Sequence, residues 1–272
     1  MSFEHELLTI RIERPATGGG VGRASDGRVS FVRNSLVGEL VRAQVTEATS
    51  KFYRGEAVEI LEPSRDRVSP PCAYAHPFGC GGCDLQHADA RAQVEWKTAL
   101  VAEHLRRIAG LEWSVEMVPG SLGEATRTRL RCAVDHQGRL ALRRARTNDL
   151  VPIDTCWVAQ RAFDEAFARP WPGVEEVELR AIGDGEPFAV TRSGRDAYAS
   201  VEVRSLSGTP LDPSTHSRVR VGAHVYRVGP RSFWQSHRDA PAILSDAVME
   251  LVRLDDGDDA VELYGGVGLF SV

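Results

Sequence analysis

A compact cysteine motif constrains the fold of this chain more than any other feature of its sequence: Cys72, followed by Cys80-Gly-Gly-Cys83. Two thiolates separated by two residues can reach one metal centre, and glycines let the backbone turn tightly around it. The amides of Gly81 and Gly82 can also donate hydrogen bonds to sulfur. The segment is therefore predicted to be a metal-binding loop.

The motif supplies three cysteines, whereas a metal ion or cluster usually takes four protein ligands. Cys132 lies inside a predicted strand, where a small buried thiol is ordinary. Cys156 follows Pro152 at a transition from strand to loop, and we favour it as the fourth ligand. Spacing alone leaves zinc as an alternative to iron–sulfur. Burial of all five cysteines as inert core thiols is a third interpretation.

The composition describes a globular chain without a membrane or export signal. Its 272 residues, 42% of them hydrophobic, can bury the core of one or two domains. No run of about 18 apolar residues predicts a transmembrane helix, and the acidic N-terminus is the opposite of a signal peptide. We therefore expect a cytoplasmic protein, in which a disulfide framework is not expected.

Basic residues are concentrated in one segment, although the net charge of the chain is −5. Residues 127–146 contain seven arginines and one acidic residue, whereas residues 162–272 contain 11 basic and 18 acidic residues. This asymmetry favours a basic face that could bind nucleic acid. Only two of the 33 basic residues are lysines, so a solvated, arginine-rich strand pair is an equal alternative.

Residues 6–62 are predicted to form a small β domain. Short segments rich in apolar and β-branched residues alternate with turn signals, among them Gly18–Gly20. Closely spaced strands of this kind are typical of a barrel, which leaves no exposed sheet edge. The expected strands are Leu7–Ile12, Val29–Val32, Leu40–Val45 and Ala57–Ile60.

The middle of the chain is predicted to contain one helix and a second group of strands. The helix covers 89–109, with Asp89 as its N-cap and Gly110 as its stop. Hairpin turns are expected at Asp135–Gly138 and Ser193–Arg195. The expected strands are Leu130–Val134, Leu140–Arg144, Val177–Ala181, Phe188–Thr191 and Ala199–Val203.

The pattern changes again from Pro241 onward. One helical stripe is followed by an acidic turn at Asp255–Asp259, a short apolar strand at Ala260–Leu263 and the glycine loop 265–268. A helix, a strand and a glycine loop in this order are the opening of a doubly wound α/β domain.

The cysteine motif resembles that of the bacterial RNA methyltransferases that make 5-methyluridine and carry a four-iron, four-sulfur cluster. It continues into Gln86-His87, and the next helix holds Gln93 and Lys97, similar to the family's pattern C-x5-C-G-G-C-x-x-Q-H, although seven residues separate Cys72 from Cys80 here. Asp154–Cys156 is similar to the turn with the family's fourth cysteine. The resemblance implies a structural [4Fe–4S] cluster held by Cys72, Cys80, Cys83 and Cys156.

Both ends of the chain extend the resemblance. Phe31-Val32, Leu36–Glu39 and Leu61–Ser64 resemble the TRAM domain, an oligonucleotide-binding β-barrel. Phe233–Gln235 is similar to the family's F-x-Q-x-N, and Glu262–Phe270 to its D-L-Y-C-G-x-G-x-F, with Glu and Gly replacing the first Asp and the Cys. The resemblance implies that S-adenosylmethionine is bound by Gln235, Glu262, Tyr264, Gly266, Gly268 and Leu269.

The resemblance implies a mixed α+β and α/β protein of three parts. Residues 1–62 form an OB-like TRAM barrel, and 63–230 a central β-rich iron–sulfur domain. Residues 231–272 are the start of a Rossmann-like domain dependent on S-adenosylmethionine. The implied partner is rRNA or tRNA, bound at a single-stranded loop, with no membrane and no obligate protein partner. Its phosphates are expected at Arg127, Arg129, Arg131, Arg143, Arg144 and Arg146.

The implied reaction methylates carbon 5 of a uridine. In the family a cysteine thiolate adds to carbon 6 of uracil, which makes carbon 5 nucleophilic, and a base then removes its proton. By resemblance both groups follow the cofactor loop, and none of the five cysteines occupies the nucleophile position. We therefore assign no catalytic residue and expect the 272-residue chain alone to be inactive.

Three other functions are compatible with parts of the sequence. The first is a non-catalytic RNA-binding module, in which a TRAM barrel is joined to a metal cluster. A radical enzyme is the second, but such enzymes generally carry a C-x3-C-x2-C pattern, which this chain lacks. The third is a zinc-stabilised domain of unrelated function.

Overall fold

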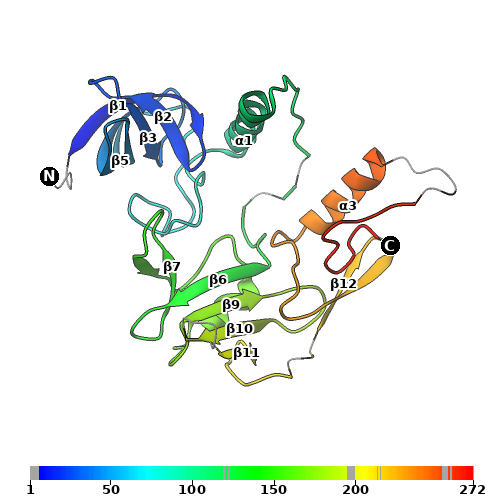
Figure 1. The fold of residues 1–272 in the computed structure, drawn as a ribbon. Coiled ribbons are helices and arrows are strands. Elements are labelled where there is room, and N and C mark those ends of the chain that lie inside the picture. Colours follow the sequence, from blue (N-terminus) through cyan, green and yellow to red (C-terminus); the bar gives the residue numbers. More distant parts are fainter. Residues whose placement is uncertain are drawn as a thin grey trace. The chain divides into compact units, whose positions relative to one another are not determined.

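The structure, a computed structural model, divides the chain into two compact units that are described separately. The first unit contains residues 1–117 and 143–149, and the second contains 118–142 and 150–272. Figure 1 shows their elements coloured along the sequence. The structure describes residues 6–118, 120–121, 123–194, 200–212, 214, 216–252, 257 and 259–271.

The first unit begins with a closed five-stranded barrel, drawn in blue in Figure 1. The strand order is β1-β2-β3-β5-β4, and β3 and β5 pair in parallel. Apolar side chains such as Ile10, Ile12 and Val41 alternate into the interior and are buried there. The strands are β1 (Leu7–Ala16), β2 (Gly19–Arg23), β3 (Val29–Arg33), β4 (Leu40–Ala48) and β5 (Phe52–Glu62).

Strand β2 begins where the sequence predicted only a turn. A Cβ atom at Gly19 would lie 2.3 Å from the carbonyl oxygen of Val32, and one at Gly20 would lie 2.3 Å from a methyl carbon of Ile12. The neighbouring strands thus approach too closely for side chains here, so these glycines belong to the barrel wall. The four strands that were predicted for this domain are confirmed as β1, β3, β4 and β5, and each is longer than predicted.

Helix α1 (Ala90–His104) continues into a π-helical turn, Leu105–Ala109, and together they confirm the helix predicted over 89–109. The Asp89 carboxylate caps it by accepting a hydrogen bond from the Ala92 N–H (2.7 Å). Gly110 ends it in the left-handed conformation, with φ of 68°. The predicted cap and stop are confirmed.

The second unit contains a six-stranded sheet of order β11-β10-β9-β6-β7-β8 and a hairpin, β12-β13. Its core is built around Phe163, Trp171 and Leu179, which are almost completely buried. A 3₁₀ turn (Arg161–Phe163) and the short helix α2 (Asp164–Phe167) close one side of that core. The strands are β6 (Arg129–Val134), β7 (Leu140–Arg143), β8 (Leu150–Pro152), β9 (Glu176–Arg180), β10 (Phe188–Ser193), β11 (Ser200–Ser205), β12 (Ser217–Val221) and β13 (His224–Val228).

The predictions for residues 127–205 agree with this sheet. All five expected strands are present, although Ala199, the first residue of one, lies outside the described residues. The turn between β6 and β7 is closed by the Gly138 N–H, which donates to the Asp135 carbonyl (2.9 Å). Arg195 of the second predicted turn also lies outside the described residues. Strands β8, β12 and β13 were not predicted.

The last part of the chain agrees with the prediction only in its helix, α3 (Ala240–Leu251). The strand expected at Ala260–Leu263 is wrong, because these residues have no regular structure and Val261 and Leu263 are 82% and 78% exposed. A parallel strand needs a neighbour, and no described residue pairs with this segment. Of the acidic turn, Asp255, Asp256 and Asp258 lie outside the described residues.

At the level of fold class, the prediction of a mixed, β-rich protein with a TRAM-like barrel is confirmed. The iron–sulfur assignment of the central part and the Rossmann-like start stay predictions. Among the described residues, no helix combines the length and apolar character needed to cross a membrane.

Candidate RNA, metal and cofactor sites

The cysteine loop in the first unit is ordered by its own backbone. The Cys80 N–H donates to the Tyr74 carbonyl (3.0 Å), and the Gly79 N–H donates to the His76 carbonyl (2.9 Å). A Cβ atom at Gly79 would lie 2.4 Å from the Tyr74 carbonyl oxygen. The chain can therefore fold back at this point only with glycine.

Three of the four predicted metal ligands lie in this loop, and they affect one another. Burial raises the pKa of the Cys80 thiol, and the neighbouring Cys83 and Cys72 sulfurs raise it further. The Gly82 N–H acts in the opposite direction by donating to the Cys80 sulfur (3.3 Å), as predicted. Dehydrated thiolates that repel one another are stabilised by a cationic metal centre. The three cysteines of this loop are therefore suitable ligands for such a centre.

Gly81 has a different role from the one predicted. Its N–H donates to the Arg143 carbonyl (3.0 Å), not to sulfur. A Cβ atom on Gly81 would lie 2.5 Å from the backbone nitrogen of Ala145. The cysteine loop is thus packed directly against residues 143–149, which belong to the same unit.

Cys132 and Cys156, the two candidates for the fourth ligand, both lie in the second unit. Cys132 is 1% exposed inside strand β6, which agrees with its interpretation as a core thiol. Cys156 is half-buried in the loop after β8, where it packs against the same core. Its role as a ligand stays a prediction.

Among the described residues, no three His, Cys, Asp or Glu side chains converge as they would around a single metal ion. In a four-iron cluster each cysteine binds a different iron, so the thiolates do not need to converge on one point.

A buried ion pair joins the barrel to the segment that leads into the cysteine loop. Glu39 is completely buried and accepts hydrogen bonds from Arg67 Nε (2.6 Å) and Nη2 (2.7 Å). It also accepts from the N–H groups of Leu36 (2.8 Å) and Ser64 (3.1 Å). Burial opposes the charge of Glu39, but Arg67 and the two amides outweigh it and lower the pKa.

His87, which the resemblance singled out, is a buried neutral side chain. Burial lowers its pKa to about 4, and the charge of Arg67 acts in the same direction. Its Nε2 lies 3.4 Å from the Ser35 carbonyl oxygen, which can accept from the neutral ring. His87 therefore supports the packing beneath the loop.

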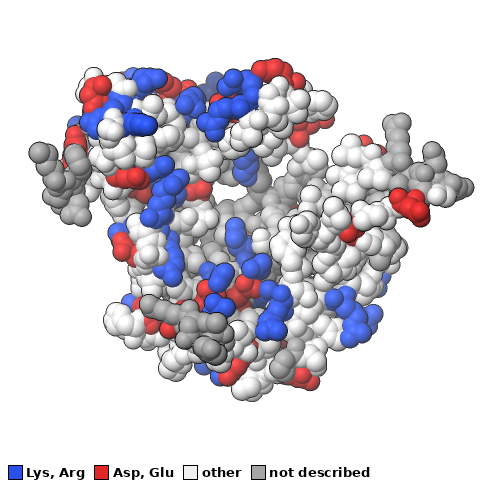
Figure 2. Space-filling model, viewed as in Figure 1, with Lys and Arg blue, Asp and Glu red and all other residues white. Residues whose placement is uncertain are grey.

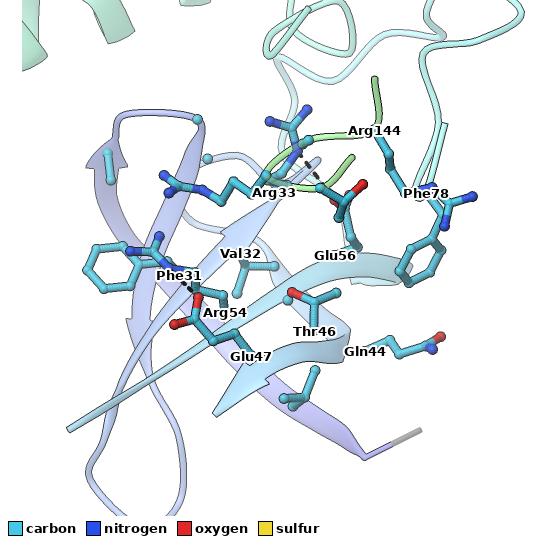
Figure 3. A pocket seen from close by; sticks show the side chains of 18 of the residues that line it. Phe31, Val32, Arg33, Gln44, Thr46, Glu47, Arg54, Glu56, Phe78 and Arg144 are labelled. Atoms are coloured by element: carbon cyan, nitrogen blue, oxygen red, sulfur yellow. Dashed lines mark ion pairs between the residues drawn. The ribbon is translucent and has the colours of Figure 1, made fainter. Parts of the chain in front are cut away.

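The barrel also carries an open cavity of about 760 Å³, shown in Figure 3. Phe31 of β3 and Phe78 of the cysteine loop stand at opposite sides of it. Gln44 and Thr46 of β4 line it between these rings. Residues 144–147 complete the rim, so the cavity is formed wholly within the first unit.

The aromatic side chains of the barrel are only partly exposed. Tyr53 is 4% exposed and belongs to the barrel core. Phe52 packs edge-on against Phe31, with ring centroids 5.9 Å apart. The Arg54 guanidinium lies 5.0 Å from the centre of the Phe31 ring and pairs with Glu47 (3.0 Å).

The arginines predicted to contact RNA are divided between the two units and differ in their partners. Strand β6 carries Arg129 and Arg131, which pair with Glu178 (2.9 Å) and Glu176 (2.7 Å) of β9. Figure 2 likewise shows acidic groups interspersed among basic ones on the visible face. Arg144 faces Asp149 at 3.5 Å. In the part of the chain that the structure describes, the remaining three form no ion pair: Arg127, Arg143 and Arg146.

The predicted cofactor loop lies in the second unit beside the β12-β13 hairpin. Gly266 and Gly268 have φ of 60° and 77°, a conformation that favours glycine. The Tyr226 hydroxyl donates to the Leu269 carbonyl (3.0 Å). Leu269 also packs against a buried cluster that contains Trp234, the neighbour of Gln235. The two predicted cofactor segments therefore meet at one cluster.

The polar side chains expected at the cofactor are less closely grouped. Glu262 accepts a hydrogen bond from the Ser271 hydroxyl, and a Cβ atom at Gly265 would lie 3.3 Å from its carboxylate. Tyr264 is fully exposed. Within the described residues, no hydrogen bond joins the side chains of Gln235, Glu262 and Tyr264.

Sequence reasoning missed two residues that the sites use. Phe78 lies between Cys72 and Cys80, where the chain has two residues more than the family pattern. This extra length was the one sequence feature that could have drawn attention to Phe78. Trp234 holds the cofactor segment on the cluster, but a single tryptophan between Phe233 and Gln235 gives no sign of which ring is buried.

Comparison with known proteins gives a consistent result. The TRAM domain family matches residues 3–58. The chain is 38% identical to an uncharacterized RNA methyltransferase of Streptomyces avermitilis, over 98% of this chain and 68% of that protein. It is 39% identical to one of Streptomyces coelicolor, over 100% of this chain and 66% of that protein. The chain thus spans about two thirds of the length of these relatives.

One further relative and one solved structure have more specific names. A 23S rRNA (uracil(1939)-C(5))-methyltransferase of Acinetobacter baylyi is 29% identical, over 100% of this chain and 66% of that protein. The crystal structure of Pyrococcus abyssi tRNA (uracil-54, C5)-methyltransferase with S-adenosyl-L-homocysteine matches with a TM-score of 0.65 at 23% identity. That match covers 99% of this chain and 70% of the other, and it shows a shared fold.

Proposed function

Because this chain belongs to the TRAM-containing RNA methyltransferase family, which includes the RNA (uracil-5-)-methyltransferases, we propose that it serves to methylate carbon 5 of a uridine in rRNA or tRNA. The observation that carries this proposal is the agreement of relatives along the whole chain, from the barrel to the cofactor loop. Likeness to the two named uracil-C5 enzymes supports the choice of base and atom.

The cofactor in this proposal is S-adenosylmethionine, which supplies the methyl group when bound. Gly266 and Gly268 let the backbone approach it where a side chain would clash. The Glu262 carboxylate and the Gln235 amide are its proposed polar contacts, and Tyr264 and Leu269 would line the same pocket. The packing of Leu269 beside Trp234 supports the grouping of these two segments.

The iron–sulfur cluster is proposed as a structural element held by Cys72, Cys80, Cys83 and Cys156. The fit of the first three rests on their mutual effect on the Cys80 pKa and on the glycine backbone around them. Since Cys156 lies far along the sequence, the cluster would cross-link distant parts of the chain. The proposed parts are a TRAM domain at 1–62, an iron–sulfur domain at 63–230 and a methyltransferase segment at 231–272.

RNA is the proposed partner, bound through a single-stranded loop. The TRAM match supports this choice, as do three arginines that form no ion pair with any described residue: Arg127, Arg143 and Arg146. The remaining predicted contacts, Arg129, Arg131 and Arg144, would have to exchange carboxylates for phosphates.

The proposal is tested by release of tritium from RNA labelled at carbon 5 of uridine. The complete product of the gene, incubated with this RNA and S-adenosylmethionine, should release tritium because the carbon-5 hydrogen is replaced by methyl. No release, with methyl transferred elsewhere, would contradict the proposed atom. Tight RNA binding without any transfer would favour the RNA-binding module.

Residues 1–272 alone are proposed not to complete the reaction. Three cysteines lie in the metal loop, Cys132 is buried in β6 and Cys156 packs on a core, so none is assigned as the nucleophile. The same assay applied to the 272-residue chain should give no tritium release, and turnover would contradict this assignment.

A further inference from the structure

The barrel cavity in Figure 3 has the size and lining of a ligand site, and of its lining only Arg144 and Arg146 enter the functional assignments above. Pockets of about 300–1,000 Å³ enclose small-molecule ligands. A volume of about 760 Å³ is therefore sufficient for one nucleotide. The question is which chemistry its walls offer.

Aromatic rings form two of its walls. The Phe31 ring is held from behind by Phe52 and by the Arg54 guanidinium (5.0 Å), which fixes its orientation. Phe78 faces the cavity from the cysteine loop and has φ of 62°. A bulky residue in this conformation is uncommon and persists only where its surroundings hold it. Half-buried rings held in this way are suited to stacking on a base.

Polar side chains without partners lie between the rings. Gln44 and Thr46 line the cavity, and within the described part of the chain their side chains form no hydrogen bond. An amide and a hydroxyl can each donate and accept, which matches the edge of an unpaired base. A purely apolar ligand would leave both groups unsatisfied.

The rim supplies positive charge for a phosphate. Arg146 lines the cavity and is exposed without an ion pair in the described part of the chain. Arg144 also lines it; its Nη1 faces Asp149 at 3.5 Å, and its Nε is buried without a hydrogen-bond partner. The acids in the lining, Glu47 and Glu56, are already paired with Arg54 (3.0 Å) and Arg33 (3.3 Å). The uncompensated charge at the rim is therefore basic.

From these observations we infer that the cavity holds one unpaired nucleotide of the RNA substrate. The base stacks on Phe78 and meets Gln44 at its edge, and Arg144 and Arg146 contact the phosphate. The inference rests on the proposed RNA substrate and adds a second point of attachment, apart from the uridine that is methylated. An acidic peptide is a less suitable ligand for the cavity, because its acidic side chains would not stack on the rings of Phe31 and Phe78.

The test is fluorescence anisotropy with a short labelled single-stranded RNA of mixed sequence and the full chain. Phe78→Leu keeps apolar volume but removes the stacking ring, so Kd should rise about 5- to 150-fold. Arg146→Ala should weaken binding and reduce the slope of log K against log salt by about 0.7. Gln44→Ala should weaken binding without changing that slope.

Two matched variants outside the cavity serve as controls. Arg42→Ala removes one exposed arginine of β4, and Trp113→Leu removes a ring that is 70% exposed. Both should bind RNA like the wild type. If Phe78→Leu fails to fold, the two other cavity variants carry the test, because Arg146 is exposed and Gln44 is a half-buried polar side chain of the cavity wall.

The outcomes separate this inference from the proposed function. RNA binding by the wild type with cavity variants equal to their controls would overturn the inference and leave the methyltransferase proposal intact. No RNA binding by the wild type would overturn it as well, whereas the tritium assay would still decide the function. Preferential binding of an acidic peptide at the cavity would contradict it directly.

Discussion

At the residue scale, the buried charge of Glu39 links the barrel to Arg67, in the segment that leads into the cysteine loop. Glu39 has no contact with solvent, and its two oxygens accept four hydrogen bonds from Arg67, Leu36 and Ser64. A buried pair of this kind is costly to break, because the remaining ion is left without a partner. The stability of the barrel thereby depends on a charged residue outside it, Arg67.

Replacing Glu39 by Gln should destabilise the first unit by about 3 kcal/mol, because Arg67 would keep its charge without a carboxylate. Urea unfolding followed by hydrogen exchange in β1 and β4 measures this loss. Glu59→Gln, which removes an exposed carboxylate paired with Arg42, should cost less than about 1 kcal/mol. Equal effects of the two changes would contradict the buried-pair account.

His87 makes the stability of the first unit sensitive to mild acid. Its pKa is about 4 in the fold and near 6.5 when unfolded, so the neutral ring contributes fully above pH 6.5 and progressively less as pH falls. Unfolding free energy should drop by about 2 kcal/mol between about pH 7.5 and about pH 5. The lowered pKa of Glu39 acts only below about pH 4.5.

His87→Gln should remove most of that pH dependence, since the amide can still donate to the Ser35 carbonyl but does not titrate. The measurement is urea unfolding of both proteins at the two pH values. An undiminished drop in the variant would assign the acid sensitivity to other groups.

Sequence reasoning worked at the residue scale where chemistry is tied to spacing. The Asp89 cap and the Gly110 stop are local, and their roles follow from neighbouring atoms. It could not show that Glu39 is buried or that Phe78 faces a cavity, because both depend on segments distant in the sequence.

At the element scale, the cysteine loop is the part on which the sites of the first unit converge. It presents Phe78 to the cavity, and its Gly81 lies directly on the backbone of Ala145. Its Cys72 N–H donates to the Gln86 side chain (3.3 Å), and Asp84 pairs with Arg33 of β3 (2.7 Å). A change that moves the loop should therefore affect metal retention and RNA binding together.

Gly81→Ala tests this coupling, because the added methyl would lie 2.5 Å from the Ala145 nitrogen and 2.7 Å from its Cα. The variant, purified without oxygen, should retain less than half of the wild-type iron and bind RNA more weakly. Gly229→Ala, where the methyl meets only a serine hydroxyl at 3.1 Å, is the control. Full iron content in Gly81→Ala would show that the loop does not need this contact.

Periodicity identified the elements of this chain better than it identified their buried faces. Among the apolar residues that recur at three- and four-residue steps along helix α1, Leu100 packs beside the buried Trp96, whereas Val94 and Val101 are 37% and 42% exposed. The buried face carries Trp96 with Ala92 and Leu100. The helix has little amphipathic contrast, so the position of its neighbours decides which face is covered.

At the scale of the whole molecule, the account joins a barrel, a metal loop and a cofactor loop in one RNA-modifying protein. A TRAM barrel at the start of an RNA methyltransferase chain could be predicted, because the barrel carries its own motif and the relatives agree along the chain. The metal loop and the cofactor loop stay predictions. The prediction of a strand at Ala260–Leu263 was wrong, because an apolar run forms a parallel strand only when another strand lies beside it.

The measurement that tests the central claim most directly is nucleoside mass spectrometry of rRNA and tRNA from cells with and without the gene. The account predicts that deletion removes 5-methyluridine from one RNA fraction and that the intact gene restores it. Unchanged 5-methyluridine in every fraction after deletion would contradict the proposed function.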